Sequence, residues 1–348
     1  MIRRRAFVLA GAMTGIGLGV TGSTGYFVGK ESRRPGKKVG IIGLDTSHSV
    51  AFTKALNDPG VGIQYLGYRI VAAYPFGSSE IVSSLERIPG YTETVRNEGV
   101  EIVGSIEELL EKVDVVMLET NDGRLHLPQA RLVLKAGKLM FVDKPVTASL
   151  ADAILLYEIA RELEVPVFSS SSLRYIDGMD DVRSGKIGNI TGVETYSPAK
   201  IEKTHPDLFW YGIHGVETLF TAMGLGCQSV VRVSNEETDL VVGTWKDGRI
   251  GTFRGIRKGK ADYGGIVFGD NGIMTLGSYT GYNQLLNKIV NFFETGIPPV
   301  RPEETLEILA FMEAADLSKA QNAAPVHLET AWERARETNK NQILSNLY

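Results

Sequence analysis

The 348-residue sequence contains little cysteine and has no excess of basic charge. Its single cysteine, Cys227, excludes an internal disulfide framework and a clustered thiolate metal site, so we interpret it as a small core residue. The formal net charge is -4 with both signs interspersed, and the chain therefore lacks the basic surface that binding to nucleic acid requires. No internal repeat and no low-complexity tract interrupts a composition that is 43% hydrophobic, which permits a sizeable core.

The N-terminus begins with arginines and continues with a weakly apolar, glycine-rich stretch, MIRRRAFVLAGAMTGIGLGVTGSTGYFVG. This layout is typical of a secretory signal. The segment RRAFV at 4–8 resembles the twin-arginine signal, which exports folded proteins. Because an A-x-A cleavage site is missing, a retained membrane tether is an alternative. We assign residues 1–35 to an export signal or membrane tether and expect a periplasmic or other extracytoplasmic location.

Residues 36–172 alternate between strand and helix signals. The apolar run 113–118 is continuous, as in strands buried inside parallel sheets. The pattern predicts strands at 39–42, 68–74, 113–118, 139–142 and 165–169, and helices at 49–57, 106–111, 128–136 and 150–163. Such alternation predicts an α/β fold with a doubly wound parallel sheet, that is, a Rossmann domain.

The sequence changes character in residues 173–300, where short β runs are separated by glycine, asparagine and aspartate turns. The segments WKDGR at 245–249 and GDNG at 269–272 indicate hairpins. We predict an α+β domain with an open, mostly antiparallel sheet for substrate binding and oligomerisation. Helices are expected at 282–295 and 302–321, and residues 301–348 are expected to form a C-terminal helical segment.

The order of these parts, together with several short motifs, resembles the Gfo/Idh/MocA oxidoreductases. The motifs are VGIIG at 39–43, DKP at 143–145, SGKIGNI at 184–190, GIHGVE at 212–217 and TGIPPVRPEETLEILAFMEAADLSK at 295–319. The resemblance covers nearly everything after Lys37. It implies hydride transfer between a sugar, inositol or related polyol and a tightly held NAD or NADP. It also implies dimers or tetramers that form through the open face of the second sheet.

Two residues match the chemistry that alcohol oxidation needs, namely a base for the hydroxyl proton and a cation beside the developing alkoxide. Lys144 fits the cation, since it follows a strand whose carboxyl end faces the ligand crevice in such sheets. Asp143 takes the place of the family's glutamate. His214 takes the place of the family's acid/base histidine, and imidazole suits this role because its pKa lies near neutrality.

The family often has an aspartate four residues before this histidine, where the present chain has Trp210. Asp207 and His205 are candidates to replace it. The spacing of the possible metal ligands His205, Asp207, His214 and Glu217 matches no helical metal-binding motif, so we expect no metal site there. Four residues are predicted to contact substrate: Arg174 and Glu217 by resemblance, and Trp210 and Tyr211, next to Phe209, because aromatic rings can stack on the apolar face of a sugar.

The turn after the first strand departs from the G-x-G-x-x-G fingerprint, because Asp45 and His48 occupy the second and third glycine positions. Asp45 brings a negative charge towards the diphosphate unless its carboxylate turns aside. Tyr74 stands where an acidic residue usually holds the ribose. The predicted cofactor-binding residues are Gly43, Asp45, Thr46, Ser47, His48, Tyr74, Thr120, Asn121, Asp143 and Lys144, while Ser78, Ser79 and Arg124 are further candidates for the ribose or a phosphate.

The sequence therefore predicts an extracytoplasmic oxidoreductase that acts on a sugar, polyol or glycoside with a tightly bound NAD(P). Two alternatives remain open at this point. One is an epimerase or lyase that uses Lys144 and His214 for proton transfer alone. The other is a carbohydrate-binding protein whose nucleotide site has decayed.

Overall fold

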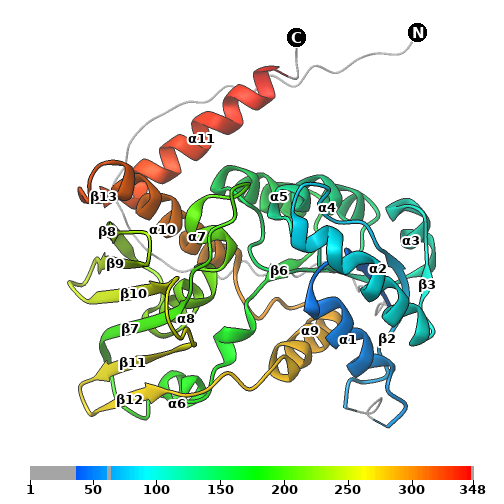
Figure 1. Ribbon diagram of the computed structural model, residues 1–348, viewed down its shortest axis with the longest axis horizontal. Coiled ribbons are helices and arrows are strands. Elements are labelled where there is room, and N and C mark those ends of the chain that lie inside the picture. The colour runs from blue at the N-terminus through cyan, green and yellow to red at the C-terminus, as the bar shows by residue number, and fades with distance from the viewer. Residues whose placement is uncertain (1–36, 61–63, 346–348) are drawn as a thin grey trace. The chain divides into compact units, whose positions relative to one another are not determined.

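The computed structural model describes residues 37–60 and 64–345 of the chain (Figure 1). The predicted export signal lies outside these residues. Among the helices that are described, none has the length and apolar character needed to cross a membrane.

A six-stranded parallel sheet with the strand order β3-β2-β1-β4-β5-β6 forms the first half of the described chain. Its elements are β1 (Lys38–Ile42), α1 (Ser47–Asn57), β2 (Arg69–Tyr74), α2 (Val82–Asn97), β3 (Glu101–Ile102), α3 (Ile106–Lys112), β4 (Val115–Leu118), a 3-10 turn η1 (Gly123–Leu125), α4 (His126–Lys135), β5 (Met140–Val142), α5 (Leu150–Glu162) and β6 (Val167–Ser169). The strand order reverses between β1 and β4, which places a ligand crevice at their carboxyl ends. The predicted Rossmann topology is confirmed.

Helix α2 and strand β3 were not predicted from the sequence. In α2 only Ser84 and Val95 are buried, so the helix shows almost no apolar periodicity. Pro89 and Gly90 in its middle are residues that normally indicate a loop. Strand β3 has only two residues, too few to show a periodic pattern.

The second half contains a seven-stranded sheet with the order β12-β11-β7-β10-β9-β8-β13. Only β7 and β10 pair in parallel, so the prediction of a mostly antiparallel sheet is confirmed. The elements are η2 (Ser172–Tyr175), α6 (Met179–Arg183), β7 (Ile190–Pro198), α7 (Asp207–Trp210), α8 (Ile213–Met223), β8 (Cys227–Ser234), β9 (Thr238–Trp245), β10 (Ile250–Ile256), β11 (Gly264–Gly269), β12 (Gly272–Leu276) and β13 (Val326–His327). Both predicted hairpin turns join adjacent strands, β9 to β10 and β11 to β12.

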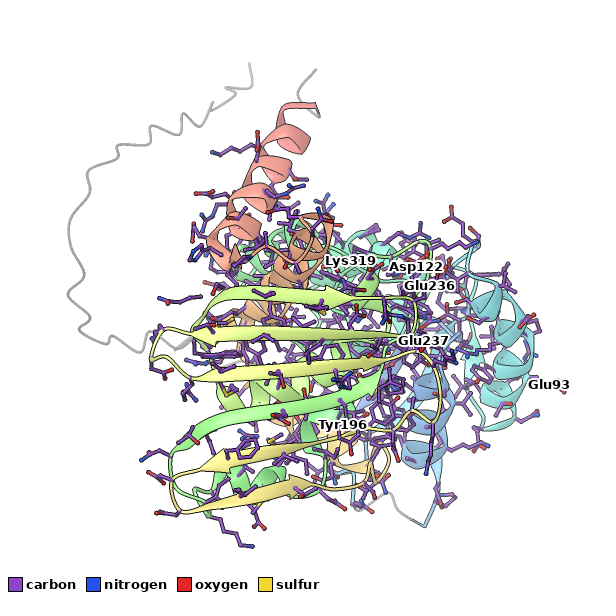
Figure 2. The ribbon with its side chains drawn as sticks, turned by 60° about the vertical axis from the view of Figure 1, so that its left-hand side comes forward. Glu93, Asp122, Tyr196, Glu236, Glu237 and Lys319 are labelled. Carbon is purple, nitrogen blue, oxygen red and sulfur yellow. The ribbon has the colours of Figure 1, made fainter. Side chains whose placement is uncertain are left out.

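One face of this second sheet packs on α8, while the other is open (Figure 2). The strand register places large apolar side chains on the open face: Tyr196, Val233, Ile250, Ile266 and Ile273 are all at least 36% exposed. The buried face carries Val193, Val230, Val241, Phe253 and Val267. The alternation of the two sets along each strand follows from the two-residue period of a β-strand.

The last helices connect the two sheets. Helix α9 (Asn283–Thr295) packs its apolar side on residues of the first sheet, with Ile289 and Phe292 in one cluster with Phe141 and Phe168. Helix α10 (Pro302–Ala320) packs on β8 of the second sheet. Helix α11 (Leu328–Ser345) packs on α10 and on α5, where Asn339 Nδ2 donates to the carbonyl oxygen of Ala151 at 3.1 Å. These contacts place both sheets against shared helices.

Candidate functional site

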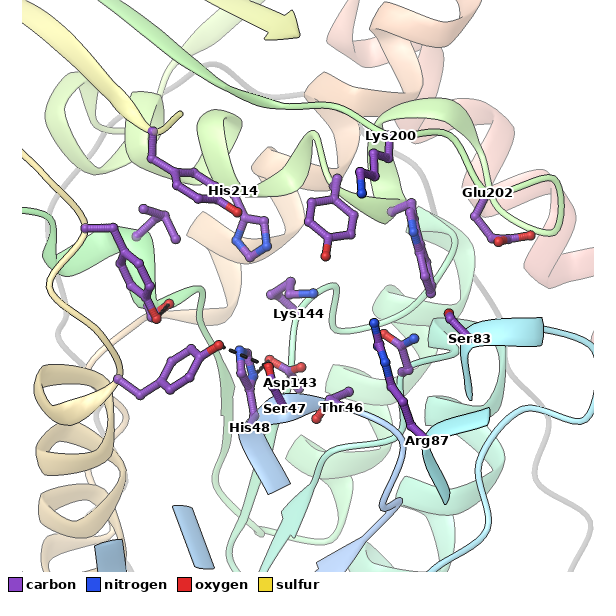
Figure 3. Close-up of a pocket in the computed structure, with 18 of the residues that line it drawn as sticks. Thr46, Ser47, His48, Ser83, Arg87, Asp143, Lys144, Lys200, Glu202 and His214 are labelled. Carbon is purple, nitrogen blue, oxygen red and sulfur yellow. Dashed lines mark hydrogen bonds and ion pairs between the residues drawn. The ribbon is translucent and has the colours of Figure 1, made fainter. Parts of the chain in front are cut away.

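A cavity of about 350 Å³ lies at the carboxyl ends of β1 and β5, in the size range of small-molecule sites (Figure 3). The start of α1 contributes Thr46, Ser47 and His48, and the turn after β5 contributes Asp143 and Lys144. The second half of the chain adds His214 and a group of aromatic residues: Trp210, Tyr211, Tyr263, Tyr279 and Tyr282. The cavity is therefore built from both halves and combines charged groups with aromatic faces.

Lys144 and His214 both line this cavity, as the sequence predicted, and Figure 3 shows both side chains pointing into it. The Lys144 Nζ lies 5.8 Å from the centre of the Tyr211 ring, a cation-π distance. Among the ion pairs between described residues, none involves Lys144. Its positive charge is thus available to a ligand.

His214 is oriented by a residue that the sequence did not single out. Its Nδ1 lies 2.7 Å from the Ser171 hydroxyl oxygen, which also accepts the backbone N–H of Leu173 at 3.1 Å. Burial lowers the pKa of His214 well below its usual value, and the charge of Lys144 lowers it further. The imidazole is therefore neutral near pH 7, with its orientation set by Ser171.

Neither candidate for the missing family aspartate reaches His214. Asp207 forms ion pairs with Arg232 and Lys319, and His205 Nε2 accepts the backbone N–H of Gly123 at 3.2 Å. Ser171 lies in a run of four serines that starts at the last residue of β6, and a hydroxyl in such a run belongs to no recognisable motif. Its position after the carboxyl end of a strand was the one available signal.

Arg174 and Glu217, which were predicted to contact substrate, do not line the cavity. Arg174 Nε donates to Glu217 Oε1 at 2.8 Å, and the same side chain also reaches Glu304. Glu217 in turn accepts the backbone N–H of Ser171 at 2.8 Å. Because a buried charge requires a partner, these side chains pair with each other and fix the segment that carries Ser171. Phe209 is likewise a core residue, whereas its neighbours Trp210 and Tyr211 line the cavity.

The carboxylate of Asp45 turns away from the cavity. It accepts the backbone N–H of Asn121 at 2.9 Å and that of Ser78 at 3.3 Å, and it is fully buried. Burial raises its pKa, and the hydrogen bonds from Asn121 and Ser78 oppose this shift. Arg124, a further candidate for the ribose or a phosphate, pairs with Asp122 and Glu80.

The first turn of α1 fits a phosphate group. Thr46, Ser47 and Asn121 line the cavity together with Arg87 from α2. The Thr46 hydroxyl is buried and has no hydrogen-bond partner, and the first amides of a helix attract anions. The residues at this end of the cavity therefore fit the diphosphate of a dinucleotide.

Other predicted nucleotide contacts lie outside the cavity because they are used within the fold. Gly43 has φ +90° and its N–H donates to the carbonyl oxygen of Tyr74. A Cβ on Gly43 would lie 2.5 Å from the backbone of Thr120, so a larger residue does not fit there. The Thr120 hydroxyl donates to Gln129, and the Ser78 hydroxyl donates to Asp122. Tyr74 packs against the ring of Phe76, and Ser79 also lies outside the cavity lining.

His48 faces away from the expected diphosphate position and towards two carboxylates. Its Nδ1 lies 3.0 Å from Asp143 Oδ1 and 3.7 Å from Glu119 Oε2. Burial alone would lower the pKa of His48, but the charges of Asp143 and Glu119 outweigh it and raise the pKa to about 10. Burial raises the pKa of Glu119 to about 7. Glu119 was missed, although it follows β4 in the same way that Asp143 follows β5.

Known proteins resemble this chain in sequence and in fold. Residues 37–171 match the family model described as "Oxidoreductase family, NAD-binding Rossmann fold" (GFO_IDH_MocA). An oxidoreductase of Escherichia coli (strain K12), YhhX, is 26% identical over 140 residues, which make up 36% of this chain and 40% of that relative.

Solved structures share the fold over most of the chain. Scyllo-inositol dehydrogenase from Lactobacillus casei, with bound NAD(H) and scyllo-inositol, has a TM-score of 0.67 and 15% identity, and the match covers 84% of this chain and 99% of that one. Myo-inositol 2-dehydrogenase from Lactobacillus plantarum has a TM-score of 0.68 and 17% identity over 83% and 98% of the two chains.

The first half of the described chain thus has the Rossmann fold of an NAD-binding oxidoreductase family. The match of residues 37–171 to the Gfo/Idh/MocA family model agrees with the resemblance predicted from the sequence motifs. The predicted cofactor class, NAD or NADP, is confirmed at the level of this family.

Proposed function

We propose that this protein oxidises a sugar or polyol hydroxyl by hydride transfer to NAD or NADP. The observation that carries the proposal is the convergence of Lys144 and His214 in one cavity, next to the phosphate-binding first turn of α1. A cation, an acid/base group and an anion site are the parts that the reaction requires. The inositol dehydrogenases that share the fold support a polyol as the substrate class.

Each residue then has a defined task. Thr46 and the first amides of α1 hold the phosphates of the cofactor, which supplies a hydride acceptor when bound. Lys144 stabilises negative charge on the substrate oxygen while His214 takes the hydroxyl proton. The Ser171 hydroxyl can donate to or accept from Nδ1 and therefore supports either neutral tautomer of the ring. Trp210 and Tyr211 present aromatic faces to the ring of the substrate.

The proposed function is tested on the purified protein in two steps. First, the protein is denatured and the extract is assayed for nicotinamide nucleotide. Second, the native protein is incubated with NAD or NADP and with scyllo-inositol, myo-inositol and common hexoses, while the absorbance of the reduced nicotinamide is recorded. We expect bound nucleotide, or reduction of added nucleotide by at least one polyol.

Two results would contradict this proposal in different ways. Epimerised or eliminated product without any nucleotide would identify a lyase or epimerase that uses Lys144 and His214 for proton transfer. Sugar binding by calorimetry, without nucleotide binding and without turnover, would identify a carbohydrate-binding protein.

The proposed location is outside the cytoplasm, on the basis of the paired arginines Arg4 and Arg5. The double variant R4K/R5K should remain in the cytoplasmic fraction, since the export machinery requires the arginine pair and not merely the charge. Fractionation and immunoblotting of the full chain measure this, and the K37R variant is the matched control. Equal export of R4K/R5K and the control would refute the signal, and recovery with membranes would indicate a tether.

We also propose that a second copy covers the open face of the second sheet. Five large apolar side chains are exposed there, and such a patch is typical of an interaction surface. Light scattering coupled to size exclusion should give at least twice the monomer mass of 38.0 kDa. A monomer at micromolar concentration would disprove the assembly.

A further inference from the structure

Three ligand-type side chains converge at the wall of the cavity from separate elements. His48 comes from the first turn of α1, Glu119 follows β4, and Asp143 follows β5. One atom from each of the three lies within 4.8 Å of the other two. The exposed fractions of the residues are 6%, 0% and 1%, so the cluster is withdrawn from bulk solvent.

The polar atoms of this cluster are left without hydrogen bonds. Both carboxylate oxygens of Glu119, Oδ1 of Asp143 and Nδ1 of His48 are buried and have no hydrogen-bond partner. The Nδ1 atom of His48 carries at most one hydrogen and can therefore donate a hydrogen bond to only one of these three oxygens. Since buried polar atoms are normally satisfied, the cluster needs a group that contacts several oxygens at once. A cation meets that need.

The geometry agrees with ligands around one ion. Ligand atoms that lie about 2.0–2.2 Å from a common ion are separated by about 3.0–3.6 Å. The two distances from His48 Nδ1 are 3.0 Å to Asp143 Oδ1 and 3.7 Å to Glu119 Oε2. The shorter contact is within hydrogen-bonding range but lacks hydrogen-bond alignment, and the longer one is beyond that range, so hydrogen bonds to His48 do not satisfy the buried carboxylate oxygens.

The charges also favour an added cation. The cluster brings two carboxylates into a buried site, where one imidazolium, that of His48, lies 3.0 Å from Asp143 and 3.7 Å from Glu119 and is shared between two negative charges. Burial of charge that is not fully paired is costly. The adjacent Lys144 lies over the Tyr211 ring, and among the ion pairs of the described residues it forms none with either carboxylate. A divalent ion would neutralise both carboxylates and leave His48 as a neutral ligand.

We propose that His48, Glu119 and Asp143 bind one divalent ion of the first transition series. Two carboxylates and one imidazole suit Zn²⁺, Mn²⁺ or Fe²⁺, whereas Mg²⁺ and Ca²⁺ prefer sites made of oxygen alone. His48 and Asp143 also line the cavity, so further coordination positions face the ligand. A hydroxyl or carbonyl oxygen of a bound polyol can occupy such a position and be polarised there. This inference does not depend on the proposed redox function.

The experiment uses the full chain after removal of bound metal with a chelator and dialysis. Isothermal titration with Zn²⁺, Mn²⁺, Mg²⁺ and Ca²⁺ should give one site per chain, with Zn²⁺ binding more tightly than Mn²⁺ and both more tightly than Mg²⁺ and Ca²⁺. E119Q, which keeps the shape of the side chain, should weaken Zn²⁺ binding by at least about 100-fold, since even partners outside the coordination sphere contribute 10- to 100-fold. The matched control E107Q changes an exposed glutamate and should bind like the wild type.

A second measurement uses the wild-type protein and therefore does not depend on the folding of a variant. The electron paramagnetic resonance signal of free Mn²⁺ should disappear on addition of the wild-type protein, with a stoichiometry of one. Retention of the free signal, or equal Zn²⁺ affinity in folded E119Q and wild type, would overturn the proposal. Metal binding without any nucleotide or turnover would leave the proposal standing and would refute only the redox function.

Discussion

Replacing His214 with alanine should lower the turnover number for an oxidised polyol by about 100- to 10,000-fold, the usual contribution of a general acid/base. The imidazole lines the cavity beside Lys144 and is held in place by Ser171. The loss should appear in kcat more than in KM, because proton transfer belongs to the chemical step. Steady-state kinetics with the best substrate from the proposed panel measure it. A variant that folds and retains more than a tenth of wild-type kcat would exclude His214 as the acid/base.

The pH behaviour of His214 gives an independent readout. Burial lowers its pKa, the positive charges of Lys144 and His48 lower it further, and Asp143 opposes the shift. The neutral base should therefore persist below pH 6.5, and kcat/KM should fall only as the pH drops through this lowered pKa. An NMR titration that resolves the imidazole signals of the five histidines should give the same pKa for His214 as the kinetic profile. In K144M the pKa of His214 should rise, because one of the charges that disfavour imidazolium is gone.

Ser171 acts through His214 and is therefore a positioning residue. S171A should lower kcat by about 10- to 100-fold with little change in KM, since a displaced acid/base group costs about that much. S171T keeps the hydroxyl and should restore most of the activity. The control S170A removes a neighbouring buried hydroxyl that donates a hydrogen bond to Glu217, and it should leave the pKa of His214 unchanged. An identical titration of His214 in S171A and wild type would argue for a merely structural serine.

The second large effect concerns stability and needs no knowledge of substrate. Arg232 is 1% exposed and lies among three aspartates: Nε donates to Asp239 at 2.9 Å, Nη2 pairs with Asp207 at 2.9 Å, and Nη1 pairs with Asp316. In R232M, Asp239 would keep its pair with Arg257 and Asp207 its pair with Lys319, whereas Asp316 would lose its ion-pair partner. Removal of one partner from a buried ion pair costs about 3–5 kcal/mol.

We therefore expect R232M to lower the melting temperature by roughly 4–7 °C, since an unfolding entropy of about 2.1 cal/mol/K per residue over 348 residues gives about 1.4 °C per kcal/mol. Thermal unfolding followed by circular dichroism measures the shift. R336M is the matched control, because Arg336 pairs with Glu329 at the surface, where both side chains are more than half exposed. Such a surface pair contributes at most about 1 kcal/mol. Similar melting temperatures for the two variants would contradict a structural role for the Arg232 network.

The parts of the site that the sequence predicted share a simple cause. Lys144 and Asp143 follow a strongly apolar strand, and parallel strands bring their carboxyl ends to one edge. His214 lies in a motif, so its placement beside Lys144 followed from resemblance. Thr46 and Ser47 were found because the start of a helix attracts anions whatever the side chains are.

The parts that were missed depend on contacts between distant segments. Nothing local indicates that the Asp45 carboxylate bonds to amides of Asn121 and Ser78, which lie 76 and 33 residues away. The pairing of Arg174 with Glu217, and of Ser171 with His214, likewise crosses more than forty residues. Side-chain direction in such cases is set by packing, which a single sequence does not display.

The shared helices have a consequence for engineering. One continuous hydrophobic core includes Val142 from β5 of the first sheet, Phe253 from β10 of the second sheet and Leu309 from α10. Helix α11 packs on both α10 and α5. The two halves are therefore not interchangeable modules, and a chimera that exchanges one sheet must keep its partner helices. A calorimetric scan of the intact chain should accordingly show a single endotherm whose van't Hoff and calorimetric enthalpies agree.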